Sequence, residues 1–181
     1  AVINVINFMD GLDGFVGSNI VIALSIIGFK YNLAVLPIVS ALIGFLVWNW
    51  SPAKVFMGDS GSTFLGALYG GLIIQSHNLI EAFEISLISF PLLADGLICI
   101  IRRYFSSQNI FMAHKQNLYQ RLHQSGWSHS KVTIFYIIGT IFQSLMFLLG
   151  DMNYQLLTAI ILLSIGYYLD QFVAVKFSDV R

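Results

Sequence analysis

Long apolar runs alternate with short polar segments along the chain. A helix that crosses the hydrocarbon layer of a bilayer needs about 20 mostly apolar residues. Six runs come close to that length: 15–29, 34–50, 62–76, 82–101, 132–150 and 154–174. The first and third are short and rich in Gly and Ser, so we expect either of them to be tilted, broken or partly re-entrant. The pattern predicts an all-α, polytopic transmembrane bundle with about six crossings.

Composition agrees with a membrane location, because 57% of the 181 residues are hydrophobic and only 10% are charged. Ordinary soluble domains do not show this balance. The one cysteine, Cys99, lies in an apolar run and excludes a disulfide framework. With no internal repeat or linker, residues 1–181 are expected to form a single membrane domain. Because the chain opens with Ala1 inside a polar motif, we expect it to be the C-terminal part of a longer protein.

The basic residues predict the orientation of the bundle. The segment between the fourth and fifth predicted crossings contains no acid and holds five cations, Arg102, Arg103, Lys115, Arg121 and Lys131. Basic loops of this kind stay on the cytoplasmic side of a membrane. Counting crossings from this loop puts Lys54 and Lys176 on the same side and only Lys30 on the other. Three polar segments, 1–14, 49–61 and 102–131, then share one cytoplasmic face, where we expect a cleft.

The first polar segment carries acids and amides at a spacing of three. Residues 4–14 read NVINFMDGLDG, with Asn7, Asp10 and Asp13 as candidate site residues. Neighbours three apart lie side by side on a helix, so these side chains can act in pairs. The glycines after both acids predict that the helix opens into a loop there. Such a group can bind Mg²⁺, a sugar or a nucleotide. The alternative is a helix cap followed by an Asp-Gly turn.

The second polar segment resembles a site for a phosphate and a base. Residues 49–62 read NWSPAKVFMGDSGS and lead directly into an apolar run. Its glycines allow close approach of a ligand, and Ser60 and Ser62 stand where a helix would begin, a position that suits a phosphate. Asp59 could hold Mg²⁺ there, and Phe56 offers a flat surface to a nucleobase. A plain helix cap is the alternative interpretation.

The remaining candidates lie in and after the fourth predicted crossing. Asp95 is an acid at membrane depth, so it is either a structural partner of a basic loop residue or a site residue. The loop over residues 114–131 reads HKQNLYQRLHQSGWSHSK. We predict that His114 and Arg121 act on a diphosphate. We assign Arg102, Arg103 and Lys131 to contact with anionic lipid.

Together these motifs resemble the polyprenyl-phosphate N-acetylhexosamine-1-phosphate transferases of glycosyltransferase family 4. The likeness runs from the first residue to at least Lys131. It implies Asp59 as a Mg²⁺ ligand, with Mn²⁺ as an alternative ion, Phe56 as the stacking partner of uracil, and Asn49 as a nucleotide contact. It also implies a catalytic cleft lined by Asn7, Asp10 and Asp13, with His114 at the diphosphate and Arg121 on the substrate.

The resemblance also implies a reaction and partners. N-acetylhexosamine-1-phosphate would pass from a UDP-sugar to polyprenyl (undecaprenyl) phosphate, with release of UMP, at the bacterial inner membrane. Residues 118–122 are similar to the branch that initiates O-antigen and capsule synthesis. The expected partners are the UDP-N-acetylhexosamine, the polyprenyl phosphate, the bilayer and a second copy in a homodimer, with no nucleic acid.

One departure from the family pattern leaves alternatives open. Family members carry an Asp-Asp pair followed by a Lys upstream, and this chain contains no Asp-Asp. Either an upstream half is missing from the sequence, or the chain is a naturally shortened relative. A non-catalytic scaffold or complementing half-subunit is therefore a second hypothesis, and a transporter with Asp95 in its pathway is a third. We expect the 181-residue chain alone to be inactive.

Overall fold

A computed structural model describes residues 2–110, 112 and 114–180, and within these the chain is entirely helices and connecting segments. Its α-helices are α1 (Val2–Phe8), α2 (Phe15–Lys30), α3 (Leu36–Asn49), α4 (Gly58–Ile74), α5 (Leu79–Ile88), α6 (Phe90–Phe105), α7 (Leu118–Gln124), α8 (His129–Leu149) and α9 (Met152–Phe172). Two short 3₁₀ helices cover Leu33–Val35 and Phe177–Asp179. The predicted all-α class is confirmed, and each of the six apolar runs contains a helix.

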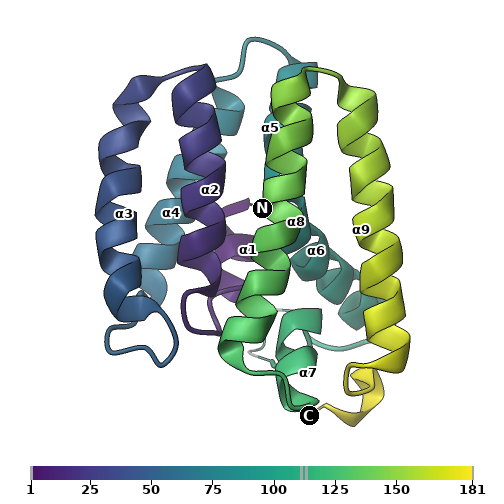
Figure 1. Cartoon of the computed structure of the whole chain (residues 1–181). Helices are drawn as coiled ribbons and strands as arrows, with labels where there is room; N and C mark the ends of the chain where they lie inside the picture. Colours follow the sequence, from purple (N-terminus) through teal and green to yellow (C-terminus); the bar gives the residue numbers. More distant parts are fainter. Residues whose placement is uncertain (1, 111, 113, 181) are drawn as a thin grey trace.

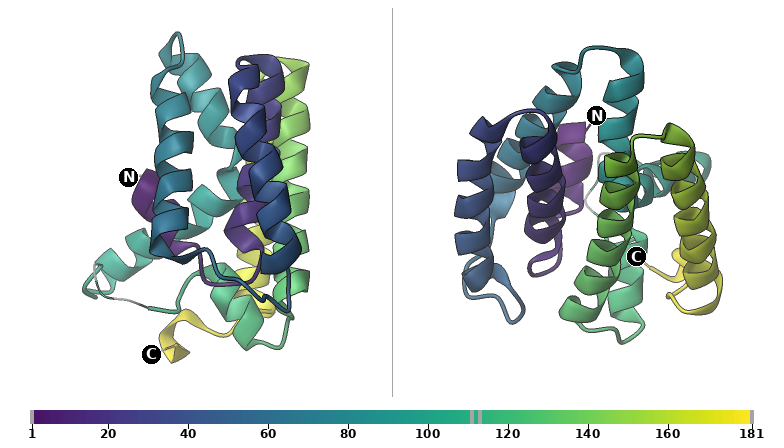
Figure 2. Two further views of the ribbon diagram at one scale, coloured as in Figure 1. Left: turned by 90° about the vertical axis from the view of Figure 1, so that its left-hand side faces the viewer. Right: turned by 45° about the horizontal axis from the view of Figure 1, so that its top comes forward.

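Most of the longer helices stand roughly parallel, whereas α6 turns away from α5 by 91°, and α1 lies beside α4 (Figures 1 and 2). Helix α1 packs against α4 and α6, α2 packs against α3 and α8, and α8 packs against α9. The core is therefore built around the first two helices. Ile6, Phe15, Ile20 and Leu24 are among the fully buried side chains. This packing fixes the turn between α1 and α2, which carries two of the candidate acids.

The three polar segments meet at one end of the bundle, which we call the loop end. The α1–α2 turn, the α3–α4 loop and α7 all lie there, and the α2–α3, α4–α5 and α8–α9 connections lie at the opposite end (Figures 1 and 2). The structure therefore brings the predicted segments to one end of the bundle, and the cleft expected between them stays a prediction. The side of the membrane that this end faces stays a prediction.

Two or three spans are long and apolar enough to cross a bilayer in the part of the chain that the structure describes. Helices α8 and α9 each qualify with 21 residues. Helices α5 and α6 qualify only as a pair, and their axes differ in direction by 91°. Residues Phe15–Lys30 and Leu33–Asn49 form shorter apolar helical segments. The count of six crossings therefore stays a prediction.

The fourth apolar run is not the continuous crossing that the sequence predicted. It breaks at Ser89, between α5 and α6, whereas α2 and α4 in the first and third runs are unbroken. Pro91 lies in the first turn of α6, where its missing N–H is tolerated. The Tyr69 hydroxyl donates to the Ile85 carbonyl at 2.5 Å and accepts from the Ser89 N–H at 3.3 Å. These contacts satisfy buried backbone groups that the break leaves without an α-helical partner.

The helical pairing predicted for the first motif is also wrong. Helix α1 ends at Phe8, so Asp10 and Asp13 lie in the turn that leads to α2. Gly14 has φ of 68°, a left-handed conformation that glycine adopts without strain, and it begins α2. The loop expected at these glycines is present, but the helix ends before Gly11, so Asn7 lies in α1 and the two acids lie outside it.

Candidate functional site

Close packing of α1 on α4 brings the first two motifs together. Gly66 of α4 has no room for a Cβ, because an added atom would lie 2.8 Å from the Ile3 backbone. At the loop end of this contact, the Ser62 hydroxyl donates to Asn7 Oδ1 at 2.5 Å. Ser62 is fully buried in this bond, which leaves Ser60 as the exposed serine of the motif.

Asp10 lies in the α1–α2 turn and Asp59 in the first turn of α4, on the two sides of this junction, and we call them the carboxylate pair. Burial, and then the nearby charge of Asp59, raises the pKa of Asp10 from 3.8 to about 6. In the described residues neither carboxylate accepts a hydrogen bond. Two acids with free acceptor oxygens can attract a cation, and Asp10 can exchange a proton near neutral pH.

Asp13 connects the first motif to α8 and to the α3–α4 loop. Its Oδ2 accepts from the Ala53 N–H at 3.2 Å and lies 3.1 Å from His129 Nδ1. The His123 and His129 rings are 4.4 Å apart. The sequence interpretation did not select His129, because a separation of 116 positions from Asp13 leaves no spacing pattern to detect. Asp13 therefore lies near Asp10 in sequence, but its carboxylate contacts groups of the α3–α4 loop and α8.

Asn49, the last residue of α3, and Phe56, in the α3–α4 loop, adopt contrasting positions. Asn49 is buried, accepting from the Gly14 N–H at 3.1 Å and donating to the Val55 carbonyl at 2.8 Å. It thereby fixes both loops to each other. Phe56 is 74% exposed and free to meet a ligand. Contact of either residue with a nucleotide stays a prediction.

His114 lies in the segment that leads to α7. Its Nδ1 accepts from the Gln116 N–H at 3.3 Å. Partial burial, followed by the charge of Arg103, lowers the pKa of His114 to about 4. The imidazole is therefore neutral at physiological pH and cannot act there as a cation. No hydrogen bond joins it to Asp10 or Asp59 in the described part of the chain.

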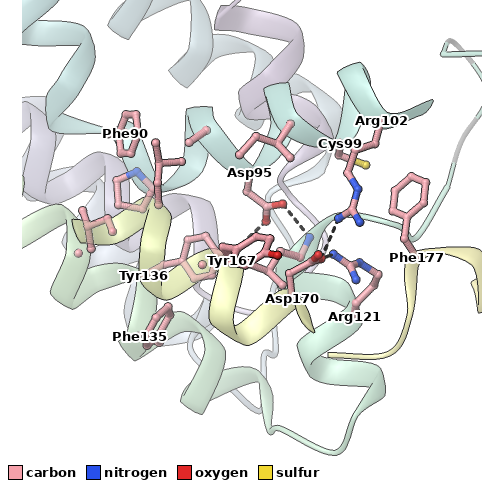
Figure 3. Close-up of a pocket in the computed structure, with 18 of the residues that line it drawn as sticks. Phe90, Asp95, Cys99, Arg102, Arg121, Phe135, Tyr136, Tyr167, Asp170 and Phe177 are labelled. Atoms are coloured by element: carbon pink, nitrogen blue, oxygen red, sulfur yellow. Dashed lines mark hydrogen bonds and ion pairs between the residues drawn. The ribbon is translucent and has the colours of Figure 1, made fainter. Parts of the chain in front are cut away.

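Helix α7 is anchored by Asp95 at its first turn. Asp95 accepts from the N–H groups of Leu118 at 2.7 Å and Tyr119 at 3.0 Å, and from the Tyr136 hydroxyl at 2.7 Å (Figure 3). Of the two interpretations of Asp95, this geometry supports the structural one. Its partners are neutral donors, and no ion pair of Asp95 occurs among the described residues, contrary to the basic partner suggested by the sequence.

Arg121 is only 2% exposed and its guanidinium is engaged within the protein. It donates from Nε to the Gln116 carbonyl at 3.0 Å, from Nη1 to the Val175 carbonyl at 2.9 Å, and from Nη2 to Asp170. Asp170 of α9 is a second residue that the sequence interpretation did not select. The predicted contact between Arg121 and substrate stays a prediction.

A cavity of about 480 Å³ lies beside Asp95 and Arg121, between α6, α8 and α9 (Figure 3). Its walls are mostly apolar, and one end carries Arg102, Arg121 and Asp170. An apolar space of this size with a few charged groups at one end is typical of small-molecule sites. The cavity reaches the same end of the bundle as the motifs.

Comparisons with known proteins connect these features to a family. Residues 1–77 match the family described as Glycosyl transferase family 4. A Bacillus subtilis protein named "Probable undecaprenyl-phosphate N-acetylglucosaminyl 1-phosphate transferase" is 37% identical over 77% of this chain and 42% of its own length. The phospho-N-acetylmuramoyl-pentapeptide-transferase of Lactiplantibacillus plantarum is 31% identical over 76% and 45%. The decaprenyl-phosphate N-acetylglucosaminephosphotransferase of Mycobacterium tuberculosis is 32% identical over 74% and 41%.

The chain matches less than half the length of these curated relatives. The family match covers the α1–α2 turn, α3, the α3–α4 loop and α4, which together hold the carboxylate pair, Asn49 and Phe56. The motifs that resembled the family in the sequence are thus the segments that the structure brings to the loop end. The chain belongs to glycosyl transferase family 4.

Proposed function

We propose that this chain forms part of an enzyme that transfers N-acetylhexosamine-1-phosphate from a UDP-sugar to polyprenyl phosphate. The observation that carries the proposal is the carboxylate pair at the end of the bundle where the motifs meet, since its oxygens accept no hydrogen bond from the part of the chain that the structure describes. The names of the relatives support this substrate class. The glycan is proposed to be a cell-surface polysaccharide such as O-antigen or capsule.

The reaction that we propose is a phosphoryl substitution. An oxygen of the polyprenyl phosphate attacks the phosphorus that bears the sugar. The bond between that phosphorus and the bridging oxygen breaks, and the oxygen leaves with UMP. The product is a polyprenyl diphosphate sugar. Charge on the phosphates must be offset and the two reacting groups held in line, which are the main tasks of an enzyme in this chemistry.

The residues at the loop end fit a Mg²⁺ ion held together with substrate. Among the residues that the structure describes, no three His, Cys, Asp or Glu side chains form a complete metal cage. Mg²⁺ rarely uses such a cage, because it is usually bound by one or two carboxylates, water and substrate phosphates. Asp10 and Asp59 would hold it, and Mn²⁺ could replace it. When bound, the ion supplies positive charge against the diphosphate.

Other side chains are proposed to bind and orient the substrates. Phe56, exposed beside Asp59 in sequence, would stack on uracil, and Asn49 holds the loop that presents it. His114, neutral at physiological pH, would donate or accept a hydrogen bond at the diphosphate. The apolar cavity between α6, α8 and α9 offers a surface of the kind that an isoprenoid chain needs.

We propose that the loop end faces the cytoplasm of a bacterium across the inner membrane, with six crossings in the chain. Lys54, Lys131 and Lys176 lie at the loop end, whereas Lys30 ends α2 at the other end. The positive-inside rule then gives this orientation. The shorter helices α2, α3 and α4 would cross with local thinning of the bilayer or beside neighbouring helices.

Binding of UDP-GlcNAc to the purified 181-residue chain in lipid nanodiscs tests the proposal without requiring turnover. Titration calorimetry should show binding that needs Mg²⁺ and is lost in Asp59→Asn. The matched control is Asp151→Asn at the opposite end of the bundle, where either side chain can cap α9. Equal binding with and without Mg²⁺, or in Asp59→Asn, would contradict the proposed site.

A transfer assay with undecaprenyl phosphate separates the two candidate functions. We expect the enzyme that carries this chain to release UMP. If Asp59→Asn abolishes UMP release, the activity belongs to the proposed site. The absence of an Asp-Asp pair favours the second candidate, a complementing half-subunit. Mg²⁺-dependent binding without UMP release, even with an upstream half co-expressed, would support a non-catalytic role instead.

A further inference from the structure

Helix α7 is too short to be stable by itself. It has seven residues, whereas isolated helices shorter than about 12–15 residues are marginal in water. Its position therefore depends on the contacts that other elements make with it. Asp95 holds its first turn from α6, as described above. A second set of contacts comes from the end of α9 and the segment that follows it.

Asp170 makes the strongest of these contacts. It accepts from Arg102 Nη1 at 2.8 Å and from Arg121 Nη2, and Figure 3 shows its carboxylate between the two guanidinium groups. Asp170 is 12% exposed and Arg121 is 2% exposed, whereas Arg102 is 37% exposed. The buried cation of α7 therefore has its counter-ion on α9. An unpaired charge at this depth would be strongly unfavourable.

The segment after α9 adds two backbone acceptors. The Val175 carbonyl accepts from Arg121 Nη1 at 2.9 Å, and the Val180 carbonyl accepts from Gln116 Nε2 at 3.3 Å. Gln116 in turn donates its N–H to His114. We call Asp170, Val175 and Val180 the C-terminal clamp. It holds both the segment that follows His114 and the helix that comes after it.

Helix α7 also contacts the turn that carries Asp10, through Tyr119. The Tyr119 hydroxyl donates to the Phe8 carbonyl at 3.3 Å, and its ring stacks on Phe15 with centroids 4.6 Å apart. Gly11 has no space for a Cβ, because the Tyr119 hydroxyl occupies that place. A shift of α7 would therefore move Tyr119 against the turn between α1 and α2, and Asp10 with it.

We propose that the C-terminal clamp sets the position of α7, and through it the positions of His114 and Asp10, for the transfer reaction. Asp170 is then a positioning residue that acts through Arg121, and Arg121 belongs to this framework rather than to the substrate-contacting groups. This inference rests on the proposed function only for its catalytic consequence. The mechanical part of the inference concerns the free chain.

Hydrogen exchange of the chain in lipid nanodiscs, measured by mass spectrometry without substrate, tests the mechanical part. Asp170→Asn should speed exchange of the α7 amides about 10- to 100-fold, the effect of losing a charged hydrogen bond on a local opening. Amides of α3 should not change. The control Asp179→Asn removes an exposed carboxylate whose partner is Ser178 and should leave α7 protected. Unchanged α7 exchange in Asp170→Asn would overturn the clamp.

A second variant keeps the test decisive if Asp170→Asn does not fold. A chain that ends at Ala174 loses the Val175 and Val180 carbonyls but keeps the Arg121–Asp170 pair, so it buries no unpaired charge. Exchange over residues 116–121 should rise by about 5- to 10-fold, the effect of losing neutral hydrogen bonds. Wild-type protection in this chain would overturn the role of the C-terminal segment.

Kinetics in the enzyme that carries this chain distinguish positioning from substrate contact. Asp170→Asn should lower kcat about 10-fold and leave the KM for UDP-GlcNAc within about twofold, because misplaced groups weaken the transition state most. Asp170→Glu, which restores the carboxylate, should recover part of kcat. A rise in KM with normal kcat in Asp170→Asn would place Arg121 on the substrate and overturn the proposed role. Hydrogen exchange is measured without turnover, so the test of the C-terminal clamp does not depend on whether the enzyme is active.

Discussion

Two groups of acids at the loop end stand in opposite physical situations. Asp95 and Asp170 each accept three hydrogen bonds from protein groups, the latter from two arginines and Gln171. Asp10 and Asp59 accept none from the described residues. All four side chains lie within one part of a small bundle, so the difference comes from the donors that the fold aims at each of them.

This contrast separates acids that hold the fold from acids that are open to a ligand. A buried carboxylate is stable only where donors or cations compensate its lost hydration. Asp95 and Asp170 meet that condition, and their oxygens are consequently used within the fold. Asp10 is partly buried and does not meet it, which is why its pKa is raised, whereas Asp59 is exposed to solvent. A bound cation would compensate both charges of the pair.

The largest effect expected from this contrast is on folding. Asp95→Ala leaves the N–H groups of Leu118 and Tyr119 and the Tyr136 hydroxyl without an acceptor. The free energy of unfolding should fall by about 3–5 kcal/mol, which lowers the thermal midpoint by roughly 10 °C in a chain of this size. Thermal unfolding in detergent measures the shift. Asp59→Ala is the control, and an equal loss of stability in both variants would remove the contrast.

The next effect is on activity. Asp59→Asn keeps the shape of the side chain but removes the charge proposed to hold Mg²⁺, so kcat should fall at least about 100-fold, or roughly 2.7 kcal/mol. Stability should stay within about 0.5 kcal/mol, because Asp59 is exposed. UMP release and membrane expression of the enzyme that carries this chain provide the two measurements. Near-normal turnover would refute the metal role.

A smaller effect is expected at the edge of the site. Phe56→Ala removes a 74% exposed ring, so UDP-sugar affinity should weaken by about 1–3 kcal/mol, the range for loss of a stacked base. Turnover at saturating substrate should be nearly unchanged. Phe29→Ala is a matched control, because Phe29 is 72% exposed at the opposite end of the bundle. Calorimetry should show weaker binding only in the first variant, and equal affinities would exclude Phe56 from the site.

The smallest effect concerns the pH dependence of stability. The pKa of Asp10 is about 6 in the folded chain against 3.8 as the ordinary value, so the folded chain holds this proton more tightly. Stability from this group is complete below about pH 3.8 and is lost as the pH rises through about 6. The amide of Asp10→Asn does not ionise, so this variant does not lose stability as the pH rises. Between pH 4 and 7 its free energy of unfolding should increase by about 1–2 kcal/mol relative to wild type, after allowance for solvent screening.

Unfolding of both chains over this pH range provides the measurement. Mg²⁺ should reduce the difference between them at pH 7, because the ion favours ionised Asp10 in the wild-type chain. A difference that does not change with pH would show that neither burial nor Asp59 perturbs Asp10.

Features that depend on neighbouring residues could be predicted from the sequence. Each apolar run contains a helix, because hydrophobic length is a local property of the chain. The loop at the first motif and a helix start at the second are also found, although α1 already ends at Phe8 and α4 begins at Gly58, two residues before the predicted Ser60. The family resemblance also rests on such local segments, and residues 1–77 confirm it.

Features that depend on distant partners were decided only by the tertiary structure. The N–H groups that make Asp95 a structural acceptor belong to α7, a different helix from its own. The pairing of Arg121 with Asp170 joins positions that are 49 residues apart. The bend at Ser89 likewise depends on the hydroxyl of Tyr69 in another helix. Hydrophobic pattern and turn chemistry act between neighbours in the chain, so the sequence determined the helices and the motifs. A carboxylate becomes a structural acceptor or an open ligand site according to the donors that packing brings to it, and only the folded chain defines those.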